Sequence, residues 1–129
     1  MPYAVDDSRW PLVTARAIAY DPQTLEACYR KIEELLARKR PFVVLFDLRG
    51  ATSSSERRRR LQEFGERYAV EIERYLAGVA LVASSPIERG FITAGLWLRS
   101  PTYPMRVFST AIEGEAWLRE DFSRVIERP

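Results

Sequence analysis

The sequence contains no histidine and a single cysteine among its 129 residues, and this scarcity excludes most familiar active-site chemistry. Without histidine there is no Ser-His-Asp triad, no Cys-His pair and no imidazole general base. Zinc, haem and iron–sulfur sites lose their usual ligands, so neither a metal nor a cofactor is expected. Cys28 cannot form an internal disulfide, which fits a reducing compartment. No residue set therefore demands a particular reaction, and we name no catalytic residue.

Long hydrophobic runs are also missing. No apolar stretch approaches the roughly 20 residues of a membrane span, and residues 1–10 carry acidic side chains where a signal peptide is basic and then apolar. We therefore expect a cytoplasmic protein without a membrane span. The net charge of +2 is too small to predict nucleic-acid binding. The six glycines are scattered, so neither a GxGxxG fingerprint nor a Walker A loop is present.

Short apolar runs organise the rest of the chain. Some are nearly unbroken valine, leucine, phenylalanine and alanine, which is typical of strands buried on both faces of a parallel sheet. Residues 12–19 instead alternate with a period of two and, with residues 3–7, predict a hairpin that turns at Asp7 to Pro11. The expected strands are residues 3–7, 12–19, 42–48, 78–84 and 105–109.

Helical periodicity follows the strands from the second one onward. Asp21-Pro22 resembles a helix start, and Cys28 lies on the apolar stripe of the helix that follows and ends at Pro41. Ser85 to Glu88 and Thr110 to Glu113 both read as capping boxes. The remaining expected helices cover residues 56–77, residues 86–99 and the segment from residue 111 onward, where Leu118, Phe122 and Val125 form the apolar stripe.

The two middle helices carry the most apolar residues. The helix over 56–77 has one continuous stripe, in which Gly65 would permit close approach to the sheet. The helix over 86–99 has a core stripe of Ile87, Phe91, Ala94, Gly95 and Leu98. Ile92, Leu96 and Trp97 lie outside that stripe, so they are either covered by the last helix or exposed as an interface patch. The continuous stripe of the helix over 56–77 comprises Leu61, Phe64, Gly65, Tyr68, Ala69, Ile72, Tyr75 and Leu76.

The element order is thus β-β-α-β-α-β-α-β-α. It predicts an α/β fold with a single mixed, mostly parallel five-stranded sheet and four helices, in one domain over residues 1–129. No internal repeat or linker interrupts it.

This order and length resemble the STAS domains of the anti-sigma-factor-antagonist type (SpoIIAA-like), and more closely the broader STAS/SEC14-like superfamily of bacterial proteins. The stretches that carry the resemblance are Trp10-Pro11, Phe46 to Gly50, Gly78 to Val82, and Tyr103-Pro104 before Val107-Phe108. The resemblance implies a non-enzymatic regulatory module that docks on a partner protein. STAS antagonists carry a phosphorylated serine in an Asp-Ser-Ser-Gly motif after the third strand. The corresponding segment here is Ala51 to Glu56, with hydroxyls at Thr52 to Ser55 but without that aspartate and glycine.

Ligands of open α/β sheets bind outside the carboxyl ends of the parallel strands. Four consecutive arginines, Arg57 to Arg60, begin a helix at this edge although they oppose its macrodipole. Two interpretations stay open: a solvated helix start, or a site for an anion or an acidic partner. Arg59 and Glu63 form the available helical pair, with Arg59 facing water. The candidate rim residues are Asp47, Arg49, Ser53, Ser54, Ser55, Arg57, Arg58 and Arg89.

The leading functional hypothesis is a STAS-like protein-interaction module, regulatory or scaffolding, which docks on a partner protein or on a second copy of itself. The alternative is a domain that binds a small apolar, phosphate-bearing or lipid-like ligand at the strand rim, beside helix 86–99. A third class, an enzyme that uses Asp47 with the hydroxyls of Ser53 to Ser55, has no support from geometry at this stage.

Overall fold

The computed structural model describes residues 3–17, 22–49, 55–87, 89–90, 93–94 and 103–126. Residues 86–87, 89–90 and 93–94 are helical. The labelled elements, in chain order, are β1 (Tyr3–Arg9), β2 (Leu12–Ala17), α1 (Pro22–Ala37), β3 (Phe42–Asp47), α2 (Ser55–Arg67), α3 (Ala69–Tyr75), β4 (Leu76–Val82), β5 (Met105–Phe108), α5 (Ala111–Asp121) and α6 (Ser123–Ile126).

The strands form one five-stranded sheet in the order β1-β2-β3-β4-β5. β1 pairs with β2 in antiparallel fashion, and the pairs β2–β3, β3–β4 and β4–β5 are parallel. The predicted opening hairpin and mostly parallel sheet are therefore confirmed. The hairpin turns at Trp10-Pro11, whose peptide bond is cis.

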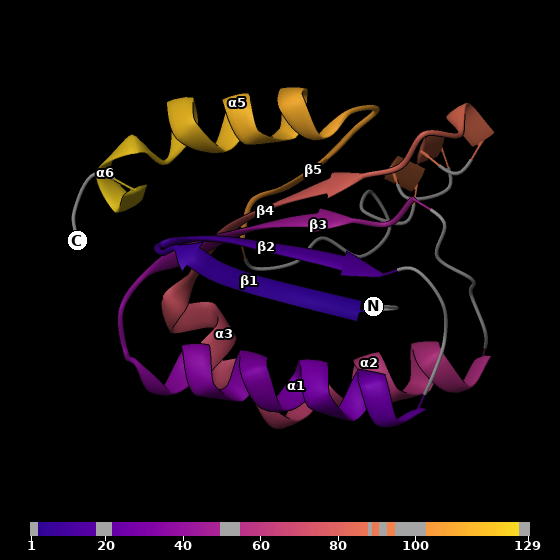
Figure 1. Cartoon of the computed structure of the whole chain (residues 1–129), viewed down its shortest axis with the longest axis vertical. Helices are drawn as coiled ribbons and strands as arrows, with labels where there is room; N and C mark the ends of the chain where they lie inside the picture. The colour runs from indigo at the N-terminus through magenta and orange to yellow at the C-terminus, as the bar shows by residue number, and fades with distance from the viewer. Residues whose placement is uncertain are drawn as a thin grey trace.

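Helices cover both faces of the sheet: α1, α2 and α3 lie on one side, and α5 and α6 on the other (Figure 1). Successive residues of a strand point to opposite faces, so each strand contributes to two cores. Leu12 and Val43 belong to the core under α5, whereas Val13 and Phe42 belong to the core under α1 and α3. This double burial explains why the inner strands are apolar at nearly every position.

Helix α5 lies very close to the sheet. A Cβ atom on Gly114 would meet Leu45 Cδ1 at 2.8 Å and Ala80 Cβ at 3.3 Å, so the backbone of α5 approaches β3 and β4 directly. Leu118 is 0% exposed, and Phe122 and Val125 pack against the same core, as the predicted stripe required. The single last helix is wrong, however, because the chain breaks at Phe122 (φ −123°, ψ 30°) into α5 and α6.

Thr110 caps α5 as predicted, because the Glu113 N–H donates to Thr110 Oγ1 at 3.2 Å. The Glu113 carboxylate accepts from the Ser109 and Thr110 hydroxyls at 2.8 Å and 2.9 Å.

The single helix predicted over 56–77 is wrong. The structure has two helices, separated by Tyr68 with φ −110° and ψ 24°, and β4 begins at Leu76 rather than at residue 78. Tyr68, Ile72 and Tyr75 pack against the core, which turns α3 toward the sheet and away from the line of α2. The expected continuous stripe is also wrong, since it is divided at Tyr68 and its first member, Leu61, is 58% exposed.

Two further side-chain predictions are wrong. A Cβ atom on Gly65 would have nothing within 4 Å, so this glycine does not serve a close approach to the sheet. Ile87, expected in the core stripe of helix 86–99, is 74% exposed, and Ala94 is exposed as well. Phe91, Gly95 and Leu98 lie outside the described residues. Within the described part of the chain, no helix is long and apolar enough to cross a membrane.

Candidate functional site

The carboxyl ends of the four parallel strands share one edge of the sheet, which we call the rim. The register aligns Arg16 of β2 with Asp47 of β3, Asp47 with Val82 of β4, and Val82 with Phe108 of β5. The segments that leave these strands therefore start side by side, as the sequence predicted for this edge.

Asp47 and Arg49 form the best-defined polar contact of the rim. Arg49 Nε donates to Asp47 Oδ1 at 2.9 Å and Nη2 donates to Oδ2 at 2.8 Å, a two-pronged ion pair. The Arg49 backbone N–H adds a third bond to Oδ1 at 3.0 Å. These bonds from Arg49 lower the pKa of Asp47, and the nearby charge of Arg16 lowers it further. The carboxylate is thus held by Arg49, and Arg16 of the neighbouring strand adds positive charge to its surroundings.

Arg89 holds the end of β4. Its Nη1 donates to the carbonyl oxygens of Ala83 at 2.9 Å and Ser84 at 2.8 Å, so part of its hydrogen-bonding capacity is used inside the protein. Its charge also reaches the start of α5, where it helps to lower the pKa of Glu113. The main cause of that lowered pKa is hydrogen bonding from the hydroxyls of Ser109 and Thr110.

The structure brings some predicted site residues together and leaves others undescribed. Asp47 contacts Arg49, and Arg89 lies at the neighbouring strand end. Ser53, Ser54, Ile92, Leu96 and Trp97 lie outside the described residues. Ser55, Arg57 and Arg58 belong to α2 by their backbone, but their side chains lie outside the described part of the chain. Arg59, as predicted, faces solvent and pairs with Glu63 at 3.9 Å.

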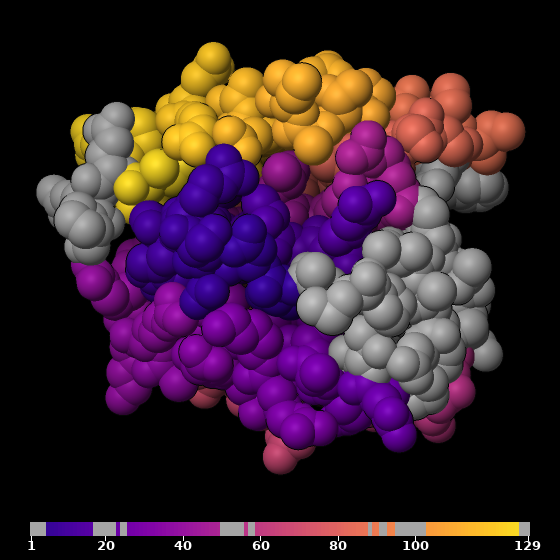
Figure 2. All heavy atoms as spheres, in the orientation of Figure 1, coloured from indigo at the N-terminus to yellow at the C-terminus, as the bar shows by residue number. Residues whose placement is uncertain are grey.

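Sequence reasoning missed an exposed apolar pair at the rim. Ile87 is 74% exposed and Ile112 is 84% exposed; they lie in the first turns of the helical segments that follow β4 and β5. Figure 2 shows the coral atoms of the segment after β4 beside the orange start of α5. Both isoleucines follow a capping residue by two positions, where helix formation does not require an apolar side chain. That spacing was the signal that could have revealed them.

An open pocket of about 450 Å³ lies between β5 and the helical segment that follows β4. It is lined by Arg89, Gly90, Thr93, Ala94 and Val107. Apart from the Arg89 guanidinium and the Thr93 hydroxyl, its side-chain lining is apolar. Such a surface can accept an apolar group from a ligand or a partner, with a cation at its margin.

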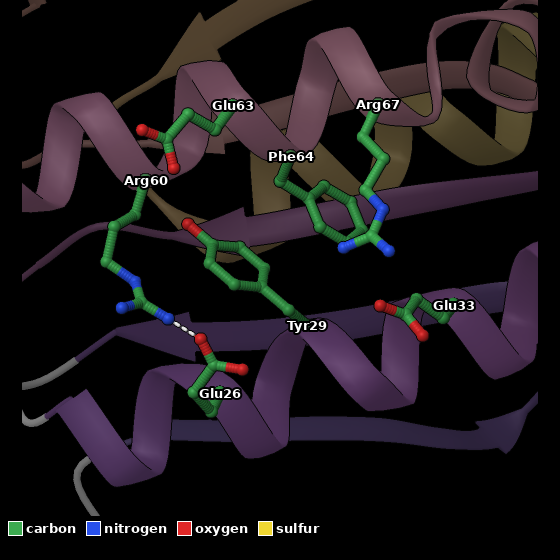
Figure 3. A pocket seen from close by; sticks show the side chains of 7 residues that line it. All are labelled: Glu26, Tyr29, Glu33, Arg60, Glu63, Phe64 and Arg67. Carbon is green, nitrogen blue, oxygen red and sulfur yellow. Dashed lines mark ion pairs between the residues drawn. The ribbon is translucent and has the colours of Figure 1, made fainter.

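A second hollow lies between α1 and α2 (Figure 3). Its volume is about 190 Å³. Tyr29 and Phe64 stack at its centre, and Arg60 of α2 forms an ion pair with Glu26 of α1. The lining residues are Glu26, Tyr29, Glu33, Arg60, Glu63, Phe64 and Arg67.

No group of three or more potential metal ligands of the His, Cys, Asp or Glu type occurs among the described residues. Among the described residues, no Asp, Glu, Lys or Arg side chain is buried as a whole, whereas Cys28 and Tyr29 are buried.

Comparison with known proteins agrees with this architecture. The sequence matches no model of a known protein family and no curated protein. The structure is similar to that of an uncharacterized DUF3478-family protein from Shewanella loihica PV-4, which has a SpoIIAA-like fold. The TM-score is 0.69 at 15% identity, over 90% of this chain and 91% of the other. This chain thus has a SpoIIAA-like, STAS-like fold, as the resemblance implied.

Proposed function

We propose that this protein is a non-enzymatic interaction module of the STAS-like type, regulatory or scaffolding, which works in the cytoplasm by docking its rim on a partner protein. The observation that carries the proposal is the exposed pair Ile87 and Ile112 at the edge of the sheet. The SpoIIAA-like fold supports it as an analogy of architecture.

The isoleucine pair has no evident role in folding. Burying one isoleucine side chain is worth about 1.5–3 kcal/mol, and this gain is largely unused here because both side chains face solvent. Isoleucine is also a weaker helix former than alanine, glutamate or lysine, so local propensity does not favour it at these positions. A partner that covers both side chains would recover this burial energy, and apolar anchors bordered by charged groups are typical of an interface centre.

Charges around the pair would orient the partner. Arg49 pairs with Asp47, and Arg16 aligns with Asp47 on the neighbouring strand; two cations beside one carboxylate favour an acidic group of the partner at the β2–β3 side of the rim. We keep Ser53, Ser54, Ser55, Arg57 and Arg58 as proposed members of this surface. Ile92, Leu96 and Trp97 remain a proposed patch for self-association.

The experiment compares two double variants as baits in native lysate. Ile87→Asp/Ile112→Asp removes the apolar pair, and the aspartates suit the first turn of a helix. Leu61→Asp/Val70→Asp is the matched control, since these side chains are 58% and 67% exposed on the opposite layer. We expect the rim variant to lose at least about 90% of a specifically captured protein, roughly the tenfold that 1.4 kcal/mol represents. The control should retain that protein, and both variants should stay folded by circular dichroism. Equal capture by the rim variant and the wild type would contradict the proposal.

The second candidate function is binding of a small apolar, phosphate-bearing or lipid-like ligand. The pocket of about 450 Å³ beside Val107 favours it, because its volume falls in the range of small-molecule sites. Native mass spectrometry of the purified protein tests it. A bound small molecule that disappears in Ala94→Trp, which fills the pocket, would support this function over protein docking.

A further inference from the structure

Helix α2 is the most weakly anchored long element among the described residues. None of its described residues is buried, although the helix has 13 residues. Its apolar side chains with a described position are Leu61, which is 58% exposed, and Phe64, which is half-buried. Neither belongs to the two core clusters on the faces of the sheet.

Among the described side chains, the Phe64 ring and the Arg60 ion pair join α2 to α1. Phe64 stacks on Tyr29 of α1 with centroids 4.6 Å apart and planes at 15°, and it contacts Tyr68 at 4.8 Å. Arg60 pairs with Glu26 of α1. Figure 3 shows Tyr29 and Glu26 of α1 facing Phe64 and Arg60 of α2 across the hollow between the two helices. The hollow of about 190 Å³ and the empty space beside Gly65 indicate that the remaining interface is loosely packed.

The boundary of this loose element is sharp. Tyr68 breaks the helix and packs against the core, and its hydroxyl bonds to Glu33, which raises the pKa of Tyr68. Immediately after it, Ile72 and Tyr75 of α3 pack against the same core, and the chain then enters β4. The anchored part of the chain therefore begins at Tyr68.

We infer that α2 is a latch. It opens as one unit at Tyr68 while the sheet, α1, α3 and α5 stay folded, and opening removes the Phe64 ring from Tyr29. An isolated helix of this length is marginal in water, so the released segment unfolds. The opened state uncovers the aromatic faces of Tyr29 and Tyr68, and a partner that covers these rings would hold the latch open. This device does not involve the proposed docking pair Ile87 and Ile112 and does not depend on it.

Native-state hydrogen exchange, read residue by residue, tests the latch on the wild-type protein. We expect amides of α2 to be at least about 100-fold less protected than amides of β3. Phe64→Ala should lower the protection of α2 at least about tenfold further, because it removes the ring that joins α2 to α1.

The decisive variant lies on the other face of the sheet. Leu118→Ala destabilises the whole fold and should lower the protection of β3 at least about 30-fold. If α2 opens by itself, the hydrogen-exchange rates of its amides in this variant stay within about twofold of the wild-type rates, since the opening of α2 does not disturb α5. The milder Leu118→Val serves the same purpose if the alanine variant does not fold. Protection of α2 equal to that of β3 in the wild type, or a parallel fall of both in the Leu118 variant, would overturn the inference.

Discussion

Helices α2 and α5 are of similar length and lie on opposite faces of the same sheet, yet they are held in different ways. The backbone of α5 approaches β3 and β4 so closely that Gly114 has no room for a Cβ atom, and Leu118 is fully buried. In α2, a Cβ atom on Gly65 would meet nothing within 4 Å, and the exposed side chain of Leu61 contributes little to packing. Both sequences are helical, but only α5 is also part of the core.

The difference shows that the contribution of a leucine or a glycine to stability depends on how closely its helix approaches the sheet. A leucine or a glycine has the same intrinsic helix propensity in both helices. The two helices differ in how much packing against the sheet adds to, or subtracts from, the folding free energy at that residue. Matched substitutions in the two layers therefore measure the packing contribution directly.

The largest expected effect comes from Leu118→Ala. Removing this fully buried side chain should lower the free energy of unfolding by about 3–4 kcal/mol, because buried apolar surface is lost and a cavity is left. The matched control Leu61→Ala, in α2, should cost less than about 0.5 kcal/mol. Urea unfolding followed by circular dichroism measures both values. Costs that agree within about 1 kcal/mol would mean that the two layers are equally packed.

The next effect is at Gly78, on the α5 side of β4. A Cβ atom there would lie 2.4 Å from Cζ of Phe122, so Gly78→Ala must displace this ring. We expect a loss of about 1–3 kcal/mol in the free energy of unfolding. Gly78→Ala/Phe122→Leu should cost less than the sum of its single substitutions, because the leucine removes the clashing ring atoms. Strict additivity would show that the ring is not the cause.

The same glycine-to-alanine change in α2 should have the opposite sign. A Cβ atom on Gly65 meets nothing within 4 Å, and alanine is the better helix former. Gly65→Ala is expected to raise the free energy of unfolding by about 0.5–1 kcal/mol. Thermal and urea unfolding would register this as a higher midpoint. A lower midpoint would mean that α2 packs more tightly than its exposed residues indicate.

The smallest effect is expected at the rim, where charge rather than packing decides. The Arg49 ion pair depresses the pKa of Asp47 in the folded state, so its stabilisation is present above the unfolded pKa of about 3.9. It is lost as the pH falls through the folded pKa. Arg49→Gln should cost no more than about 0.5 kcal/mol at pH 7, because Arg49 is 43% exposed. Unfolding at pH 7 and at about pH 2 should show this difference disappear at the lower pH. A titration of the Asp47 carboxyl by NMR should show its pKa rise in the variant.

Much of the fold could be predicted from the chain. The unbroken runs at β3 and β4 indicated strands buried on two faces, and Thr110 with Glu113 marked the start of α5. The break at Tyr68 could not be predicted, because the apolar spacing continues through it and only the core contacts of α3 reveal the change of direction. The exposed position of Ile87 was hidden for a related reason, since a helical stripe shows which residues share a face but not what that face meets.

For the candidate site, the sequence correctly placed Asp47 and Arg49 at a strand end, because that follows from local chain order. It could not show that Arg89 uses its guanidinium on the carbonyls of Ala83 and Ser84, or that Arg16 of another strand aligns with Asp47.

Periodicity and capping thus determined the strands, most of the helix starts and the element order along the chain, because these depend on neighbours within a few residues. The tertiary structure alone decided which helix touches the sheet, which glycine is crowded and which isoleucine remains in water. These properties depend on distances between segments far apart in the chain, and no local pattern encodes them.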